Sequence, residues 1–244
     1  MDPLTATAAS GLRARMESLD LLANNVANAS TGGYKADREF YSLYADPEAL
    51  ESGSASAMPL IERPWTDLSQ GTLQTTGGPF DLALTGRGFF AVNGPLGPLY
   101  TRNGSFRLAA DGTLVTTDGL PVRGSGGAPV SLDGSRPVDI AADGTIRQGG
   151  AVVGKLEVVD FTSPDGLAKQ GANYFRVSGP GARPIAPSGT SVEQGKIETS
   201  NTGSAESAVR LVSVMRQFEM LQKAVSIGAE MNQQAVQQVA RVGS

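Results

Sequence analysis

The sequence contains no cysteine and no histidine. Without these residues the chain forms no disulfide, and it carries neither a thiolate nucleophile nor a histidine-based catalytic triad. Most zinc sites are also excluded, because cysteine and histidine supply most of their ligands. Any acid, base or nucleophile must come from Asp, Glu, Lys, Ser, Thr or Tyr. A chain without cysteine also suits a protein that leaves the cytoplasm unfolded, since stray cross-links cannot form.

Charge and long apolar runs are scarce as well. Charged residues make up 18% of the 244 residues, and the net charge is −4 with both signs scattered, so no basic stripe suggests nucleic acid. No stretch reaches the roughly 20 apolar residues of a membrane span, which predicts no membrane insertion. The N-terminus begins with Met1 and Asp2 and lacks the basic start and apolar core of a cleaved secretory signal.

Helix-forming residues fill the stretch from about Ser204 to Val242, whose only glycine is Gly228. This stretch predicts a helix on the order of 50 Å long at ~1.5 Å per residue. One apolar stripe comprises Leu211, Met215, Phe218, Leu221 and Val225, and it is widened by Val214, Met220, Ile227 and Met231. The plainer interpretation is a core helix of an ordinary globular protein. The other is a helix that packs against a second long helix and against neighbouring copies, because so wide an apolar surface needs partners on more than one side.

A second helix is predicted from Pro3 to about Asn28. Residues three and four apart form a coiled-coil-like seam. They are Thr5, Ala9, Leu12, Met16, Leu19, Ala23 and Val26. Three amides follow at Asn24, Asn25 and Asn28, which we expect to hydrogen-bond across a helical interface. A capped helix end followed by a turn is the plainer interpretation of Asn28 and Gly32.

Residues 36–76 lose the helical period and predict an extended connector with a short strand or hairpin. Its aromatic cluster, Phe40, Tyr41, Leu43 and Tyr44, either packs on its own domain or contacts a neighbouring subunit. Residues 77–199 predict an all-β domain, with strands at 89–92, 113–116 and 155–159. Asp-Gly pairs, which favour tight hairpins, begin at Asp111, Asp118, Asp133, Asp143 and Asp165. The segment 108–114 is nearly repeated at 140–146, which suggests a duplicated hairpin.

The aspartates and glycines of the predicted β domain allow three chemical interpretations. The turn aspartates lack the second carboxylate that a calcium loop needs, and Gly86-Arg87-Gly88 lacks the following helix and Lys-Ser/Thr pair of a phosphate loop. Two aspartates meeting across a cleft would make a carboxylate-dependent peptidoglycan hydrolase, although each is already explained as a turn residue. Arg102 is either a surface arginine paired with a carboxylate or a structural brace that holds two hairpins in register.

Specific motifs resemble the bacterial flagellar rod and hook family along nearly the whole chain. They are LANNVANASTGGYKA at 22–36, GTLQTTG at 71–77, LTGRGFFAV at 84–92, YTRNGSF at 100–106, LAADGTLVTTDG at 108–119, GKIETSN at 195–201 and RQFE at 216–219. Two features depart from the family pattern. Gly33 is inserted where the family often has Thr-Thr-Gly, and Thr202 and Gly203 follow Asn201 where an apolar residue is usual.

This resemblance implies an α+β fold in which long N- and C-terminal helices pair as a coiled-coil-like module beside a central all-β domain. The expected divisions are residues 1–35, 36–76, 77–199 and 200–244. The expected subunit interface comprises Leu12, Met16, Leu19, Ala23, Asn24, Asn25, Val26, Asn28, Leu211, Met215, Phe218, Leu221 and Val225. The short chain and the Ala-Asp after Lys35 favour a proximal-rod subunit over a distal-rod one.

The implied function is structural and not enzymatic, with no cofactor and no metal. Subunits of this family assemble into a helical tube that transmits torque in the periplasmic rod, after export without a cleaved signal peptide. The implied partners are other rod subunits, copies of the same chain, the flagellar export apparatus, ring proteins and peptidoglycan. The hydrolase acting on peptidoglycan is the alternative.

Overall fold

The computed structural model describes residues 3–39, 41–45, 57–61, 64–171, 173–179 and 181–242. The chain forms two compact units. The helical unit comprises residues 1–27, 37–66 and 203–244, and the β unit comprises residues 28–36 and 67–202. These units cut across the four-part division predicted from the sequence, because residues 28–36 belong to the β unit and residues 37–66 to the helical unit.

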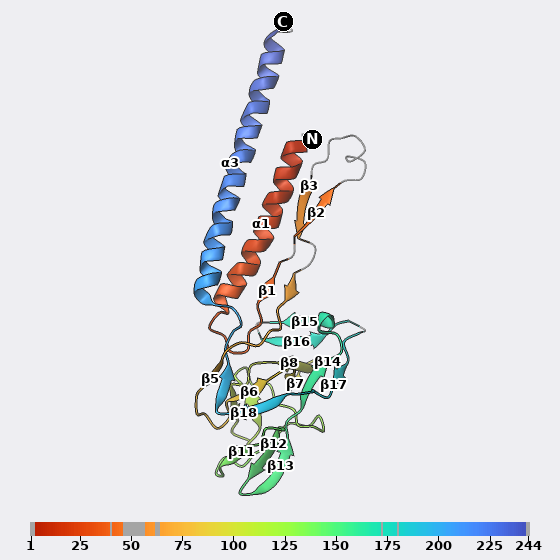
Figure 1. Cartoon of the computed structure of the whole chain (residues 1–244), viewed down its shortest axis with the longest axis vertical. Coiled ribbons are helices and arrows are strands. Elements are labelled where there is room, and N and C mark those ends of the chain that lie inside the picture. Colours follow the sequence, from red (N-terminus) through yellow and green to blue (C-terminus); the bar gives the residue numbers. More distant parts are fainter. Residues whose placement is uncertain are drawn as a thin grey trace. The chain divides into compact units, whose positions relative to one another are not determined.

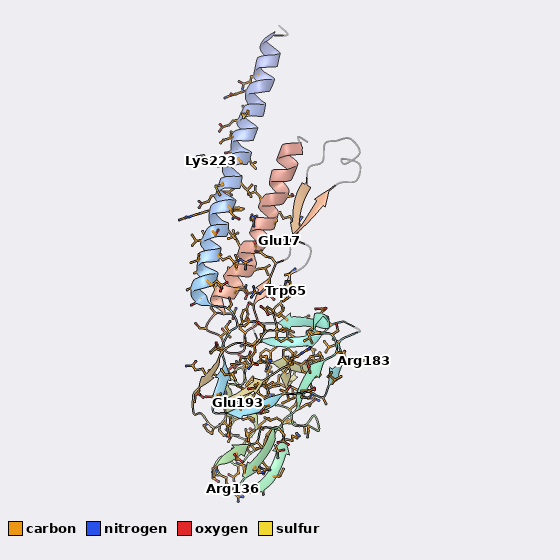
Figure 2. All side chains as sticks on the ribbon, in the orientation of Figure 1. Glu17, Trp65, Arg136, Arg183, Glu193 and Lys223 are labelled. Atoms are coloured by element: carbon orange, nitrogen blue, oxygen red, sulfur yellow. The ribbon has the colours of Figure 1, made fainter. Side chains whose placement is uncertain are left out.

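Two helices dominate the helical unit, α1 (Pro3–Ala27) and α3 (Ser204–Val242), and they lie side by side (Figure 1). Both predicted helices are confirmed almost to the residue. Antiparallel ribbons complete the unit: β1 (Asp37–Arg38) pairs with β4 (Trp65–Thr66), and β2 (Tyr41–Ala45) pairs with β3 (Ala57–Ile61). The predicted connector is thus built of paired strands. The side chains of its aromatic cluster lie outside the described residues. Trp65, labelled in Figure 2, is half exposed.

Short antiparallel strands form the β unit. A six-stranded sheet has the order β15 (Leu167–Gln170), β16 (Tyr174–Val177), β8 (Gly97–Thr101), β7 (Phe89–Gly94), β14 (Val158–Phe161) and β17 (Pro184–Ile185). A three-stranded sheet comprises β11 (Val138–Ile140), β12 (Thr145–Gln148) and β13 (Ala151–Lys155). Three two-stranded pairs complete the unit: β5 (Leu73–Thr75) with β19 (Lys196–Glu198), β6 (Leu82–Thr85) with β18 (Ser191–Gln194), and β9 (Phe106–Leu108) with β10 (Leu114–Thr116). The α+β class is therefore confirmed.

Strand β7 separates two apolar cores, because successive side chains point to opposite faces of a strand. Phe90 and Val92 enter the larger core, and Phe89 and Ala91 enter the smaller one. Phe90 packs edge-on against Phe106 with ring centroids 5.3 Å apart. The predicted strand at 89–92 is thus buried on both faces.

The duplicated hairpin is confirmed at the level of hydrogen bonds. In the first copy, Ala109 N donates to Thr113 O and Gly112 N donates to Ala109 O; in the second, Ala141 N donates to Thr145 O and Gly144 N to Ala141 O. The glycines of both copies, Gly112 and Gly144, adopt φ of 81°, which explains why each Asp is followed by glycine.

Two details of the predicted β domain are wrong. The expected strand at 155–159 is broken, because β13 ends at Lys155 and β14 begins at Val158 in a different sheet. Leu156, between them, turns into the larger core. The Asp-Gly pair at Asp165 forms no hairpin either. It lies in the 3-10 turn η1 (Pro164–Gly166), where Pro164 starts a turn that joins two strands not paired with each other.

Candidate functional site

The inner face of α3 carries a stripe of residues that alternate four and three apart. They are Ser207, Leu211, Val214, Phe218, Leu221, Val225 and Gly228, and all are buried or half buried. Met215 was predicted on this stripe, but it is 46% exposed, and Val214 is buried at 6% instead. Helix geometry explains the difference: at ~100° per residue, Val214 lies roughly 20° around the helix from Ser207, whereas Met215 lies roughly 80° from it, at the edge of the face.

A second apolar stripe lies on the opposite face of α3. It comprises Val209, Val212, Met220, Ile227 and Met231, and each is exposed, with Val209 at 72% and Met231 at 66%. Arg216 and Lys223 interrupt the stripe, and Figure 2 labels Lys223. Nothing in the described helical unit covers these side chains. We call this set the outer stripe.

The buried face of α1 is not its predicted seam. Leu12, Leu19 and Val26 are half buried, and Met16 and Ala23 are exposed. The buried positions are instead Gly11, Ala14, Ser18, Leu22 and Asn25. Their small side chains bring the helices close: a Cβ built at Gly11 would lie 3.8 Å from Leu221 Cδ1. The prediction failed because it placed the packed face one or two residues too far along the helix: the buried positions 11, 14, 18, 22 and 25 precede the predicted positions 12, 16, 19, 23 and 26.

The three predicted amides lie at different places. Asn25 is buried, and its side chain pairs with the backbone of Asp37: Nδ2 donates to Asp37 O over 2.8 Å, and Asp37 N donates to Oδ1 over 3.0 Å. Asn28 Oδ1 accepts from Thr31 Oγ1 in the turn after α1, as the capped-end interpretation predicts. Asn24 is exposed. The amide of Asn25 therefore ties α1 to β1 within one chain.

Glu39 makes a further connection in the helical unit that the sequence did not indicate. Its side chain is only 6% exposed and lies 3.4 Å from the guanidinium of Arg210 on α3. Ser18 of α1 donates its hydroxyl to the other carboxylate oxygen. One carboxylate thus contacts both helices.

Segment Gly33–Ala36, which we call the staple, is the part of the β unit that follows α1. All four of its residues are buried. Gly33 N donates to Glu198 O over 2.7 Å, Tyr34 O accepts from Asn201 N, and Ala36 O accepts from Asp67 N over 2.9 Å. Lys169 donates to Lys35 O and lies 4.5 Å from the centre of the Tyr34 ring. The staple is therefore held along its whole length.

A buried charge cluster fixes the side chain of the staple's lysine. Lys35 Nζ lies 2.5 Å from Glu198 Oε1, and both side chains have no exposed surface. Nζ also donates to Ser69 O. Glu198 Oε1 accepts from Gly71 N over 2.8 Å, and Oε2 lies 3.6 Å from Arg102 Nη1. Burial lowers the pKa of Lys35, and the charge of Glu198 opposes that shift. The carboxylate joins three segments far apart in the sequence.

Arg102 is buried, so the interpretation as a surface arginine is wrong. Its guanidinium donates to Gly86 O over 2.6 Å and to Leu84 O over 3.4 Å, and it lies 5.8 Å from the centre of the Phe89 ring. Burial lowers its pKa, opposed first by Glu198. The residue braces the turn between β6 and β7 and adds a charge partner for Glu198. That it holds two hairpins in register, the other interpretation, stays a prediction.

Asn201 gathers the chain ends of the β unit. Its Oδ1 accepts from Ala36 N over 2.8 Å, and its Nδ2 donates to Asp67 O over 2.6 Å. The chain passes between the two units four times, after residues 27, 36, 66 and 202. Ala36, Asp67 and Asn201 lie at or next to three of those passages, and their hydrogen bonds link them within the β unit.

Two glycines allow these segments to approach. Gly33 adopts φ of 67°, and a Cβ there would lie 2.2 Å from Asn103 N; a Cβ at Gly71 would lie 2.2 Å from Thr199 O. Gly32 has ordinary φ, and its Cβ would meet only the movable Asn103 Oδ1 within 3.4 Å, at 3.2 Å. The backbone therefore requires glycine at 33 and leaves room for a side chain at 32.

Comparison with known proteins finds relatives that match most of this chain. Residues 6–35 match the family described as flagella basal body rod protein, residues 83–148 match the flagellar hook protein FlgE/F/G D1 domain, and residues 193–238 match the flagellar basal body rod FlgEFG protein C-terminal. The flagellar basal-body rod protein FlgF of Caulobacter vibrioides is 32% identical over 228 residues, covering 92% of each chain. FlgG of Buchnera aphidicola subsp. Acyrthosiphon pisum is 32% identical over 255 residues, covering 93% of this chain and 96% of the relative.

The chain belongs to the flagellar basal-body rod protein family. FlgG of Bacillus subtilis, at 28% identity over 93% of this chain, is a more distant relative. The terminal matches include all of the predicted interface residues, and they also contain Lys35 and Glu198 with Asn201. They thus cover most of both helices, residues 33–35 of the staple and two of its partners, whereas Asp67, Ser69 and Lys169 lie outside them.

The turn aspartates of this rod protein serve their own turns. Asp111, Asp133 and Asp143 each accept a hydrogen bond from the backbone N–H two residues ahead, and all three residues are exposed. Hydrogen bonds from Thr145 and Lys155 lower the pKa of Asp143 to about 2. Asp118 accepts from the Tyr174 hydroxyl. A glycosidase acid needs a raised pKa, whereas the pKa values of Asp111, Asp133 and Asp143 are lowered.

No group of three or more acidic side chains in the described residues is arranged to hold a metal ion. Among the described helices, none is both long enough and apolar enough to cross a membrane. Two features of this rod protein remain to be explained: the exposed outer stripe and the buried staple.

Proposed function

We propose that this protein is a structural subunit of the flagellar rod, assembling with copies of itself and with homologous rod proteins into a helical tube that transmits torque. The outer stripe carries the proposal. An apolar surface on the face of α3 opposite its packed face needs a partner from another molecule, and burial contributes roughly 25 cal/mol per Å². A contact between two different surfaces repeats into an open helix when its rotation does not close into a ring.

Within one subunit, the terminal helices pair as a coiled-coil-like module. The spacing of the inner stripe on α3, alternately three and four residues, supports this pairing. Of the predicted interface residues, the exposed ones would contact a neighbouring subunit, among them Met16 and Met215. Asn25 already bonds within the chain, so its contribution would be to hold β1 in place.

Residues 1–35 and 200–244 would build the wall of the rod, and residues 77–199 would form its projecting part. The family resemblance further supports export through the flagellar apparatus without a cleaved signal peptide, a place in the periplasmic rod, and contacts with ring proteins and peptidoglycan. The protein acts mechanically and not as an enzyme: the exposed, low-pKa turn aspartates favour this over a peptidoglycan hydrolase.

A proximal-rod role is favoured by the lengths of the matches. The alignment with FlgF runs over 228 residues for 92% of this chain, whereas the alignment with FlgG needs 255 residues for 93%. FlgG therefore carries inserted residues that this chain and FlgF lack, while the identity is 32% in both cases.

The test introduces a charge into the proposed subunit contact at positions where the fold of the isolated protein should not change. Met220→Asp and Met215→Asp change exposed side chains of α3, so the purified variants should unfold at the wild-type temperature. In the rod, an unpaired charge buried between subunits costs several kcal/mol, so cells carrying either variant should lack complete rods and should not swim.

Gln222→Asp is the matched control, since Gln222 is an exposed residue of the same helix outside the outer stripe. It should assemble and swim normally. Electron microscopy of isolated basal bodies gives the readout. Complete rods containing the Met220→Asp protein would refute the outer stripe as the subunit contact.

A further inference from the structure

The interactions described above tie the staple to residues of its own β unit. Its polar partners are Glu198, Asn201, Asp67, Ser69 and Lys169. All five belong to the β unit, as do the staple residues themselves. These interactions therefore lie within the β unit.

The partners also come from separate parts of the chain. Glu198 follows Lys35 by 163 residues, and Asp67 and Ser69 come from the segment that returns from β4. The side chain of Asn201 closes the arrangement, because it accepts from Ala36 N and donates to Asp67 O at the same time. These are the residues beside which the chain leaves for the helical unit.

We propose that Glu198 and Asn201 are positioning residues that keep the staple docked in the β unit, whether or not the helices are ordered. Docking fixes the points from which the chain passages leave the β unit. A force applied to α1 or α3 is then shared among the passages, because hydrogen bonds link them to one another within the β unit. No single passage transmits the whole force to the strand next to it.

Two variants and one control separate positioning from plain stability. Asn201→Ala removes both side-chain hydrogen bonds, and Asn201→Asp keeps the acceptor for Ala36 N but removes the donor to Asp67 O. Gln194→Ala is matched to them, since the Gln194 amide also bridges separate segments: Oε1 accepts from Ile140 N, and Nε2 donates to Pro79 O and Val138 O. Gln194 contacts no staple residue through these bonds.

Hydrogen exchange on the full-length wild-type protein in solution tests docking directly. The amides of Gly33, Ala36, Asp67 and Gly71 should be protected even when those of α1 exchange quickly. Asn201→Ala should speed exchange at Ala36 by about tenfold or more, because the acceptor for Ala36 N and the bond to Asp67 O are lost together. Ala91, in β7, should remain protected in every variant, which shows that the unit is folded. Rapid exchange at Ala36 in the wild type, or unchanged exchange in Asn201→Ala, would overturn the proposal.

A change in stability alone should not alter how swimming speed depends on viscosity. Swimming speed in media of low and high viscosity is therefore the second measurement, and it rests on the proposed function. Asn201→Ala should lose a larger fraction of its speed at high viscosity than Gln194→Ala, when the two unfold at similar temperatures. Equal losses would overturn the positioning role. The exchange result stands apart from rod assembly, so failure of docking and failure of the rod function are distinguishable.

Discussion

Replacing Lys35 with methionine should destabilise the β unit far more than replacing an exposed lysine. The change keeps a side chain of similar length but leaves Glu198 buried, with only Arg102 as a charge partner, at 3.6 Å. Breaking a buried ion pair by removing one partner costs about 3–5 kcal/mol. Because Arg102 and Gly71 N still face the carboxylate, we expect the lower end of that range, about 3 kcal/mol.

The effect is large enough to measure by thermal unfolding. For a unit of this size, 1 kcal/mol shifts the melting temperature by about 2–4 °C, so the transition of the β unit should fall by roughly 6–12 °C. Circular dichroism in the β region, or calorimetry, follows it. Lys155→Met is the matched control. Lys155 pairs with Asp143 at 3.2 Å, but both side chains are about half exposed, and such pairs contribute about 0–1 kcal/mol.

A second variant checks the reason for the loss. Lys35→Met combined with Glu198→Gln leaves no buried carboxylate without its lysine, and the glutamine oxygen still accepts from Gly71 N. The double variant should lose less stability than the sum of the two single variants, since residues in one charge network are coupled. If Lys35→Met shifted the transition no more than Lys155→Met, the reasoning about the buried cluster would be refuted.

Two further predictions concern single positions in the β unit. Gly33→Ala should be strongly destabilising, because Gly33 has a left-handed backbone conformation and an added Cβ would clash with the backbone of Asn103. Gly32→Ala should unfold near the wild-type temperature, and similar losses in both variants would contradict this geometry. Asp143 has a folded-state pKa of about 2, below the ordinary 3.8, so its stabilising contribution is complete above pH 4 and disappears as the pH falls towards 2. Unfolding of Asp143→Asn should therefore depend less on pH over that window, and identical pH profiles would disprove the assignment.

Local signals predicted the fold well where short-range chemistry decides the outcome. The absence of proline and the excess of helix formers located α3, and the Asp-Gly pairs of the two repeats located identical turns at Gly112 and Gly144. The same signal failed at Asp165, because Pro164 set a different turn. Glycine after aspartate permits a hairpin but does not impose one.

The staple and its partners were beyond sequence reasoning for a different reason. A buried lysine has no periodic pattern, and the residue that compensates its charge, Glu198, is 163 positions away. The buried face of α1 was missed because Gly11, Ala14 and Ser18 carry little hydrophobic signal, although small residues allow the closest approach of two helices. The sequence contained one local signal: Lys35 follows Gly33 shortly after the end of a predicted helix.

The half-exposed Trp65 has a practical consequence. It is the only tryptophan in the chain, and it lies in β4 of the helical unit. The β unit contains no tryptophan, so tryptophan fluorescence reports on the ribbon of β1 and β4 beside α1. An indole that is half exposed to water emits at a longer wavelength than a buried one. Adding subunits to a growing end should shift that emission to the blue if a neighbour covers the ring, so assembly can be timed in a cuvette with no attached dye.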